Sequence, residues 1–395
     1  MAHPDAVADP GPAVTAALRA ELALRRAELL AVDPRLAADA DRLADFALTG
    51  KQLRPRFLCW GYRAVREIGG DVVAGTGDTD GTDGTDGTDG TGAPAPVVLP
   101  DAVIRAAAAL ELIQACALVH DDLIDRSDTR RGGPSMHRAI AKSHADAGWS
   151  GESDHYGTSI ALLLGDLALA WADDLFTAAA AELGVLDRAL PPWRAMRLEV
   201  LAGQILDVRV GVELGADATA QDADAMLVNR YKTAAYTVER PLHLGAALAG
   251  GGDDAVGLLR RYGAAVGMAF QLRDDVLGVF GDPLVTGKPT GDDLAEGKRT
   301  ALVALARAGL ADRATELAAL DAGLGRSADP EDLSRLAAVI TGSGAPDRVE
   351  ERIRDLTAEG IAVLDERAAG DAPVLAPAVT RELRAVALAM TTRTR

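Results

Sequence analysis

Apolar residues recur every three or four positions along much of the chain, which is the pattern of helices that bury one face. Few segments alternate apolar and polar residues as a half-buried strand would. Clusters of proline and glycine separate the helical segments, because these residues interrupt helices. The pattern therefore predicts an all-α fold. The segments expected to be helical are Leu18–Leu30, Val103–Leu118, Ile160–Leu183, Trp193–Val210, Ala225–Ala249 and Val256–Val279, and the separating clusters are Pro191-Pro192, Gly250-Gly251-Gly252 and Gly281-Asp282-Pro283.

One stretch lacks this pattern. Residues 74–96 contain four Thr-Asp-Gly triplets and end in Ala-Pro-Ala-Pro. A segment with so few apolar side chains cannot offset its own ordering entropy, so we predict a disordered loop. A calcium-binding repeat is the alternative, but the nonapeptide period of such repeats is absent. Helical patterns lie on both sides of the loop, which predicts a single domain over residues 13–395 after a disordered N-terminus at residues 1–12.

Composition and charge exclude several classes of protein. The chain has 395 residues, of which 48% are hydrophobic and only 4% aromatic, and its net charge is −18 at pH 7. A protein this acidic lacks the basic patches that phosphate contact in nucleic acids requires. The two cysteines, Cys59 and Cys116, provide neither a disulfide framework nor a zinc finger.

Nothing in the sequence indicates a membrane or an export route. Met1–Pro12 lacks a basic region followed by an apolar run, the pattern of a signal peptide. No stretch of about 18 uncharged apolar residues occurs, so no membrane span is predicted. We expect a cytoplasmic protein.

The first candidate for chemistry is an acidic helix end. The stretch Leu110–Asp125 reads LELIQACALVHDDLID, an apolar helix that leads into paired aspartates. Asp121 and Asp125 are four positions apart and share a helix face, where like charges repel. Carboxylates near a helix C-terminus also oppose the helix dipole. The arrangement requires a cation, and Mg²⁺ suits it because this ion takes carboxylate oxygens and bridges to phosphates. A solvated helix end is the alternative.

A second acidic helix end follows at Phe270–Gly278, which reads FQLRDDVLG. Two helices that each end in paired carboxylates are expected to face one another across a metal site, as helix bundles build such sites. Cations follow both motifs and suit a diphosphate ligand. They are Arg130 and Arg131 after the first motif, and Lys288 and Lys298 after the second.

Other phosphate and hydrolase motifs do not fit. The two Gly-Lys segments near residues 281–299 have the wrong spacing for a nucleotide P-loop. No HExxH zinc motif and no GxSxG nucleophile motif is present.

Taken in order, these motifs resemble those of the trans-isoprenyl diphosphate synthases, the polyprenyl synthetase family, and in particular bacterial geranylgeranyl diphosphate synthases. The resemblance extends from about Leu48 to Thr300. It implies a single large helical bundle around a central cavity. The matching positions are Gly50-Lys51-Gln52-Leu53-Arg54-Pro55, Gln114, DDLID with Ser127–His137, Gly165-Asp166, Gly203-Gln204 with Asp207, Lys232-Thr233, FQLRDD, Lys288 and Lys298.

The resemblance implies prenyl transfer, in which isopentenyl diphosphate is condensed with an allylic diphosphate (dimethylallyl, geranyl or farnesyl) and pyrophosphate leaves. It implies a homodimer. It implies Mg²⁺ held by Asp121, Asp122, Asp125, Asp274 and Asp275. The residues expected to act in catalysis are Asp121, Asp125, Arg130, Lys232, Asp274 and Lys288. The residues expected to bind the substrates are Lys51, Arg54, Gln114, Arg130, Arg131, Lys232, Thr233, Gln271, Lys288 and Lys298, with Arg130 serving the allylic diphosphate and Arg131 the isopentenyl diphosphate.

The second motif departs from the family's DDxxD pattern. Gly278 stands where a third carboxylate would be, which puts the strength of the second metal site in doubt. Asp282, four residues further along, is the acid that we expect to contribute in its place, through water.

Product length is expected to follow the depth of the cavity. Cys116 and Ala117 lie five and four residues before Asp121, one helical turn deeper, and both are small. In the family, bulky aromatic residues at these positions stop growth at fifteen carbons, so the resemblance implies twenty carbons or more. The alternative is that Cys116 is a packed core residue.

Two other functions remain open. A class I terpene cyclase shares the fold and the metal, but it binds one diphosphate, which would leave Lys51, Arg54 and Arg131 without a ligand. A catalytically silent subunit of a heteromeric synthase is favoured by Gly278 and opposed by the intact first motif.

The first testable prediction concerns the Thr-Asp-Gly loop. We expect a variant without residues 74–96 to condense the two substrates at a rate within about twofold of the full chain, because a segment this polar contributes nothing to a packed core. The rate is measured with labelled isopentenyl diphosphate on protein of matched helical content. A large drop in turnover would contradict this prediction.

Overall fold

The computed structural model describes residues 9–68, 98–213, 217–283, 290–368 and 371–392. The predicted loop at residues 74–96, Lys288, and residues 1–8 of the predicted disordered N-terminus lie outside the described residues. Helix α1 begins at Gly11, inside the segment 1–12 that the sequence predicts to be disordered. Apart from loops, short bridges and one hairpin of two-residue strands, the described chain is helical, so the all-α prediction is confirmed.

The elements follow one another as a series of helices of very different length. The first half comprises α1 (Gly11–Val32), η1 (Pro34–Leu36), α2 (Ala37–Leu48), α3 (Leu53–Arg66), α4 (Asp101–Ile124), β1 (Thr129–Arg130), β2 (Gly133–Pro134), α5 (Met136–Asp146), α6 (Ser153–Glu182) and α7 (Leu186–Val212). The second half comprises α8 (Ala218–Val228), η2 (Asn229–Glu239), α9 (Arg240–Ala249), α10 (Asp253–Phe280), α12 (Asp292–Glu296), α13 (Ala301–Gly309), α14 (Ala314–Gly323), α15 (Pro330–Gly342), α16 (Ala345–Val363) and α17 (Pro377–Thr391).

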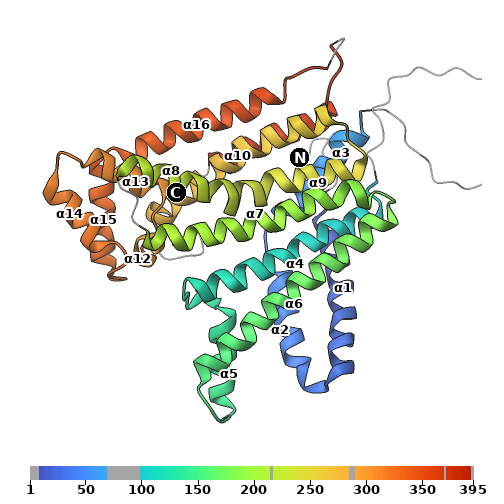
Figure 1. Ribbon diagram of the computed structural model, residues 1–395, viewed down its shortest axis with the longest axis horizontal. Helices are drawn as coiled ribbons and strands as arrows, with labels where there is room; N and C mark the ends of the chain where they lie inside the picture. The colour runs from blue at the N-terminus through green and yellow to red at the C-terminus, as the bar shows by residue number, and fades with distance from the viewer. Residues whose placement is uncertain (1–8, 69–97, 214–216, 284–289, 369–370, 393–395) are drawn as a thin grey trace, which may run out of the picture.

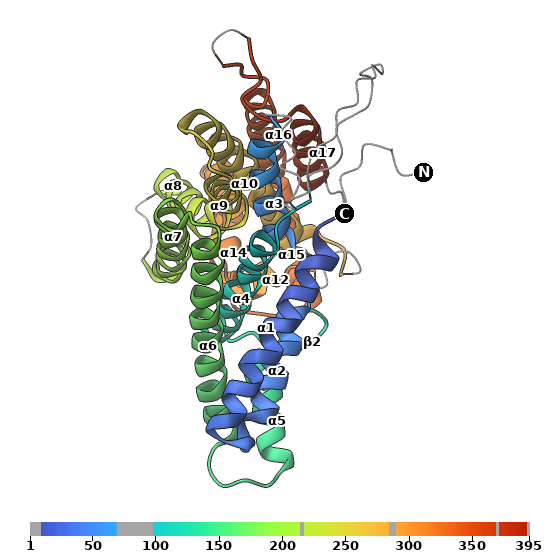
Figure 2. The same ribbon diagram turned by 90° about the vertical axis from the view of Figure 1, so that its right-hand side faces the viewer.

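The long helices form the body of the molecule, and the short ones extend it. In Figure 1, the long helices α4, α6, α7, α10 and α16 run across the molecule, and α12–α15 form a lobe at the left. Figure 2 shows α1, α2 and α5 at one end of the molecule, with α16 and α17 at the opposite end. Helix α4 packs against α6, and α10 packs against both η2 and α16, so the two acidic helix ends belong to the central layer.

The predicted helical segments are all found, with one change of helix type. The sequence predicts one helix over Ala225–Ala249, whereas the structure has α8, a π-helix (η2) and α9 in direct succession. A π-helix winds more loosely than an α-helix and often occurs at functional sites. The spacing of apolar residues does not reveal η2, because the chain stays helical from α8 to α9.

The prediction that Pro191-Pro192 separates two helices is wrong. Helix α7 begins at Leu186, so both prolines lie in its second turn. Proline in a helix removes intrahelical hydrogen bonds and costs about 3 kcal/mol or more. Pro192 and Trp193 are buried, and the Trp193 ring stacks on Phe176 of α6, which offsets that cost. The two glycine-containing clusters do separate helices, as predicted.

Small residues let the central helices approach one another closely. The four alanines at residues 106–109 of α4 are fully buried. Gly245 of α9 faces α3, where a Cβ atom would lie 2.0 Å from the carbonyl oxygen of Leu58. The alanine-rich composition therefore has a packing role as well as a helix-forming one.

One of the described helices, α4, is long and apolar enough to cross a membrane by length and composition alone. Within the fold, 78% of its most apolar window is buried against other helices. That burial is typical of a core helix, which passes the same test.

Candidate active site

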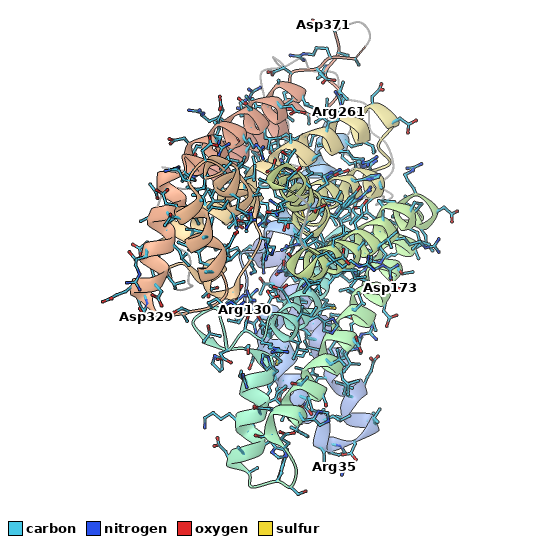
Figure 3. The ribbon with its side chains drawn as sticks, turned by 60° about the vertical axis from the view of Figure 1, so that its left-hand side comes forward. Arg35, Arg130, Asp173, Arg261, Asp329 and Asp371 are labelled. Atoms are coloured by element: carbon cyan, nitrogen blue, oxygen red, sulfur yellow. The ribbon has the colours of Figure 1, made fainter. Side chains whose placement is uncertain are left out.

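A cavity of about 870 Å³ lies between the C-terminal parts of α4 and α10. Its acidic side comes from the two aspartate motifs and α12, and its cationic side from α3 and the loop after α4. Figure 3 places Arg130 well inside the molecule, whereas Arg35, Asp329 and Asp371 lie at its edges. The lining residues include Lys51, Arg54, Glu111, Gln114, Leu118, Asp121, Arg130, Arg131, Asp207, Lys232, Thr233, Phe270, Gln271, Asp274, Asp275, Gly278, Asp293 and Lys298.

Asp121 is held by groups from two other helices. Its Oδ1 accepts hydrogen bonds from Lys232 Nζ at 3.0 Å and from Gln204 Nε2 at 3.1 Å. Lys232 also contacts Oδ2 of Asp207 at 2.5 Å. Burial alone would raise the pKa of Asp121, but Lys232 and Lys298 outweigh it and lower that pKa. Asp121 is therefore a stable carboxylate at neutral pH.

Lys232 comes from the π-helix, and a glycine on α7 allows it to reach Asp121. A Cβ atom at Gly203 would lie 2.4 Å from the backbone nitrogen of Lys232, so any larger residue there would push η2 away from α7. Gly203 and Lys232, which the sequence analysis names separately among the positions that match the family, are thus in direct backbone contact.

Asp125 ends α4 and is less completely satisfied than Asp121. Its Oδ2 is buried and accepts no hydrogen bond from the described residues, and Lys298 Nζ lies 3.6 Å from it. Burial and the nearby charge of Asp121 raise the pKa of Asp125 to about 6. A buried carboxylate oxygen without a hydrogen bond is the acceptor that a hard cation satisfies.

Asp122, which the resemblance places among the metal ligands, has a different contact. Its side chain is fully buried and does not line the cavity. Its Oδ1 accepts hydrogen bonds from Nε of Arg130 at 2.8 Å and from Nη2 of the same guanidinium. Burial raises the pKa of Asp122, and Arg130 opposes that rise. Asp122 thus forms a buried ion pair with Arg130 through Oδ1, while its Oδ2, like that of Asp125, accepts no hydrogen bond from the described residues.

In the second motif too, the two aspartates differ in their surroundings. Asp274 lines the cavity. Asp275 also touches the cavity but is buried, and it accepts hydrogen bonds from Gln271 Nε2 at 2.7 Å and Asn229 Nδ2 at 3.1 Å. Burial raises the pKa of Asp275 to about 7. Gln271 is therefore a partner of Asp275 as well as a lining residue.

Gly278 leaves space for a carboxylate from another part of the chain. A Cβ atom at residue 278 would lie 2.0 Å from Oδ2 of Asp293, which comes from α12. The carboxylate of Asp293 therefore occupies the space in which a third aspartate of the second motif would begin. Asp282, the acid expected to contribute there, is exposed and does not line the cavity. No local pattern relates two positions fifteen residues apart, so the sequence gives no sign of this replacement.

The cationic side of the cavity is built around a buried carboxylate. Arg54 donates to Thr237 Oγ1 at 2.8 Å, with its guanidinium 4.3 Å from the ring centre of Tyr236. Arg131 donates to the carbonyl oxygen of Phe46 at 3.2 Å. Burial raises the pKa of Glu111, and Arg54 and Arg131 oppose that rise.

Glu111 was not singled out by sequence reasoning, although a signal was present. It lies three residues before Gln114 and so on the same helix face. Gln114 lines the cavity, and its Oε1 is buried without a hydrogen bond from the described residues. Unpaired polar groups at this depth are typical of a binding site.

The remaining predicted positions are distributed as follows. Lys51, Thr233 and Lys298 line the cavity. Cys116 and Ala117 do not: Cys116 is buried on another face of α4, with its Sγ 3.7 Å from Nδ1 of His120, and burial raises the pKa of the thiol to about 12. Their role in chain length stays a prediction.

The side chains present suit a divalent hard cation. Among the described residues, no three His, Cys, Asp or Glu side chains lie so that they could hold a metal ion as they stand. The aspartates at the ends of α4 and α10 offer oxygen atoms only, the donor set that Mg²⁺ prefers. The unsatisfied Oδ2 of Asp125 supports that fit.

Comparison with known proteins identifies similarity to the polyprenyl synthetases. The family model for polyprenyl synthetase matches residues 43–340. The chain is 35% identical over 257 residues to a geranylfarnesyl diphosphate synthase from Aeropyrum pernix, a match that covers 64% of this chain and 72% of the relative. It is 38% identical over 213 residues to a geranylgeranyl diphosphate synthase from Mycobacterium tuberculosis, which covers 54% of this chain and 55% of the relative.

A solved structure is similar over almost the whole chain. It is a geranylgeranyl pyrophosphate synthase from Corynebacterium glutamicum, complexed with isoprenyl diphosphate and magnesium. The identity is 37% and the TM-score 0.85, with 98% of this chain and 99% of that chain covered.

The contact between Asp122 and Arg130 gives a testable prediction. Replacing Asp122 with Asn removes the carboxylate that is hydrogen-bonded to the guanidinium and leaves Asp121 Oδ2, 3.7 Å from Nη2, as its remaining ion-pair partner. We therefore expect the affinity for inorganic pyrophosphate in saturating Mg²⁺ to fall about tenfold. The Mg²⁺ midpoint should remain within about twofold, since Asp122 is not a metal ligand in this interpretation. Isothermal titration calorimetry measures both quantities.

Asp128→Asn is the matched control, because Asp128 is exposed and pairs with Arg138. A raised Mg²⁺ midpoint with unchanged pyrophosphate affinity in Asp122→Asn would instead support the assignment of Asp122 as a metal ligand.

Proposed function

Since the chain belongs to the polyprenyl synthetase family of trans-prenyltransferases, we propose that it condenses isopentenyl diphosphate with an allylic diphosphate to give geranylgeranyl diphosphate or a longer product, with release of pyrophosphate. One observation carries the proposal. A single cavity has an acidic side at Asp121 and Asp274 and a cationic side at Arg54 and Arg131. Such a cavity has one end for a metal-bound diphosphate and another for a diphosphate held by side chains.

Mg²⁺ is the cation that we assign to the acidic side. Asp121 and Asp274, which line the cavity, would hold it, together with Asp125, which ends the first motif but does not line the cavity, and with Asp275 and Asp293 close by. When bound, Mg²⁺ stabilises the negative charge that develops on the departing pyrophosphate. The C. glutamicum relative, whose structure contains magnesium, supports this choice of metal.

The residues around the acidic side have complementary tasks. Arg130, Lys232 and Lys298 bind the allylic diphosphate, and their positive charge assists departure of the leaving group. Asp122 orients Arg130 and Asp207 orients Lys232. Lys288 is proposed for the same task by resemblance. Thr233 and Gln271 lie beside the reacting carbon in this assignment.

The cationic side positions the second substrate. Lys51, Arg54, Gln114 and Arg131 hold the isopentenyl diphosphate so that its double bond attacks the allylic carbon. Leu118 and Phe270 line the space between and limit access of water to the allylic cation. The allylic C–O bond breaks first, which leaves pyrophosphate and the allylic cation. The double bond then attacks this cation to form the new carbon–carbon bond, and the proton released from the isopentenyl unit passes to the pyrophosphate.

The same cavity bears on the two alternatives. A terpene cyclase would have no use for Lys51, Arg54 and Arg131, and all three line the cavity. A silent subunit is favoured by Gly278 alone. Because the Asp293 carboxylate stands over Gly278, the second motif does not lack a third acid in space.

We propose the cytoplasm as the place of action, in keeping with two charged, water-soluble substrates and with the burial of α4 in the core.

The proposed reaction is tested by a product assay. We expect labelled isopentenyl diphosphate and Mg²⁺, supplied with dimethylallyl, geranyl or farnesyl diphosphate in turn, to give prenyl products of twenty carbons or more. Chromatography after phosphatase treatment measures chain length. A stop at fifteen carbons would keep the reaction and refute the length argument from Cys116 and Ala117. A hydrocarbon product, or none, would favour the cyclase or the silent subunit.

We also propose that the protein is a homodimer. Along α7, exposed apolar side chains recur at alternating spacings of three and four residues, the seam of a helix that packs against another helix. Leu162 and Leu163 of α6, a helix that packs against α7, are also exposed. A second copy is the partner that self-complementary helix faces select. The seam consists of Leu198, Leu201, Ile205, Val208 and Val212, which are 48% to 76% exposed.

The dimer proposal gives a further prediction. We expect the double variant Leu201→Glu, Ile205→Glu to halve the mass measured by light scattering, because two charges would be buried in the seam. Leu24→Glu and Leu388→Glu on α1 and α17 are matched controls, since both leucines are exposed away from α7. An unchanged mass in the α7 variant would refute the assignment of this face.

A further inference from the structure

Lys298 is shared by carboxylates from two parts of the chain. Its Nζ lies 2.6 Å from Oε2 of Glu296, 3.6 Å from Oδ2 of Asp125 and 3.7 Å from Oδ1 of Asp293. Burial would lower the pKa of Lys298, but Asp293, Glu296 and Asp125 together raise it. The lysine is therefore a permanent cation surrounded by three anions.

Glu296 lies nearest to the ammonium, although the charge of Asp293 does most to raise the pKa of Lys298. The attraction between two charges falls with distance, and the Glu296 oxygen is a full ångström closer to Nζ than either of the others. Glu296 is also the only one of the three carboxylates that does not line the cavity or belong to an aspartate motif.

The position of Glu296 is fixed from both sides. Helix α12, which carries it, is anchored by the fully buried Leu294, whose carbonyl oxygen accepts a hydrogen bond from Gly325 N at 2.9 Å. On the other side, the hydroxyl of Ser127 donates to Oε1 of Glu296 at 3.4 Å. Ser127 follows the first aspartate motif, so Glu296 connects the segments after both motifs.

The contact between Glu296 and Lys298 affects Asp125 most directly. Its Oδ2 accepts no hydrogen bond from the described residues. Without the charge of Glu296, the nearest anions left to the ammonium are Asp125 and Asp293. An ammonium moved onto Asp125 would neutralise the carboxylate that the proposed Mg²⁺ requires.

We propose that Glu296 is a positioning residue that holds the Lys298 ammonium off Asp125 and Asp293 and so keeps the metal-facing carboxylates available to Mg²⁺. The inference rests on the proposed function. Asp207 has the same relation to Lys232, since it lies 2.5 Å from that ammonium whereas Asp121 lies 3.0 Å away. Each lysine at the acidic side is thus drawn toward a carboxylate outside the two motifs.

The test is Glu296→Gln, which keeps the size of the side chain and an acceptor for Ser127 but removes the charge. We expect the Mg²⁺ concentration at half-maximal stabilisation, measured by thermal unfolding with and without inorganic pyrophosphate, to rise about fivefold, on the scale of one ion pair. In the condensation assay, we expect the Mg²⁺ requirement to rise by the same factor, with KM for isopentenyl diphosphate unchanged.

Three further variants make the test specific. Glu296→Asp keeps the charge and should restore most of the Mg²⁺ affinity. Glu316→Gln is the matched control, because Glu316 is exposed and pairs with Arg313. The double variant Glu296→Gln, Lys298→Met removes the competing ammonium. Because Lys298 is also proposed to bind diphosphate, this variant is measured without pyrophosphate, and its Mg²⁺ midpoint in thermal unfolding should return to within about twofold of the parent.

The outcomes separate this inference from the proposed function. An unchanged Mg²⁺ midpoint in Glu296→Gln would overturn the inference, and so would a rise that persists in the double variant. If the parent protein neither responds to Mg²⁺ nor elongates isopentenyl diphosphate, the proposed function fails, and the inference fails with it.

Discussion

Negative charge buried at the ends of two helices is the constraint on which the rest of this structure depends. A carboxylate removed from water is costly unless a cation lies against it. Lys232 from the π-helix therefore lies 3.0 Å from Asp121, and Lys298 from the segment after α12 lies near Asp125 at 3.6 Å while contacting Glu296 more closely. Each cation comes from a different part of the chain, so the charges of the cavity also hold its walls together.

The charged side chains can reach these positions because glycine, which has no side chain, occupies a few points of close contact. Gly203 brings α7 onto the backbone of Lys232, and Gly278 makes room for the carboxylate of Asp293. Close packing of this kind leaves no space for even one additional methyl group. In the sequence, Gly278 removes the third carboxylate of the second motif. In the structure, the same glycine leaves the space that the carboxylate of Asp293 occupies.

The cavity is also divided by charge, and that division favours a two-substrate reaction. Glu111 lies near Arg54 and Arg131, whose positive charges oppose the rise in its pKa that burial causes. The aspartate motifs stand on the other side with unsatisfied oxygen atoms. A metal-bound allylic diphosphate on the acidic side and a second diphosphate on the cationic side would thus meet across Leu118 and Phe270.

The sequence by itself determined the helical class, the family, and most lining residues, because periodic apolar spacing and short acidic motifs are local properties of the chain. It misjudged Pro191-Pro192, where burial of Trp193 outweighs a helix-breaking signal. Only the tertiary structure decided that Asp122 pairs with Arg130 and that Asp293 stands over Gly278. These roles depend on contacts between residues distant in the chain and on the depth of burial, which no local spacing encodes.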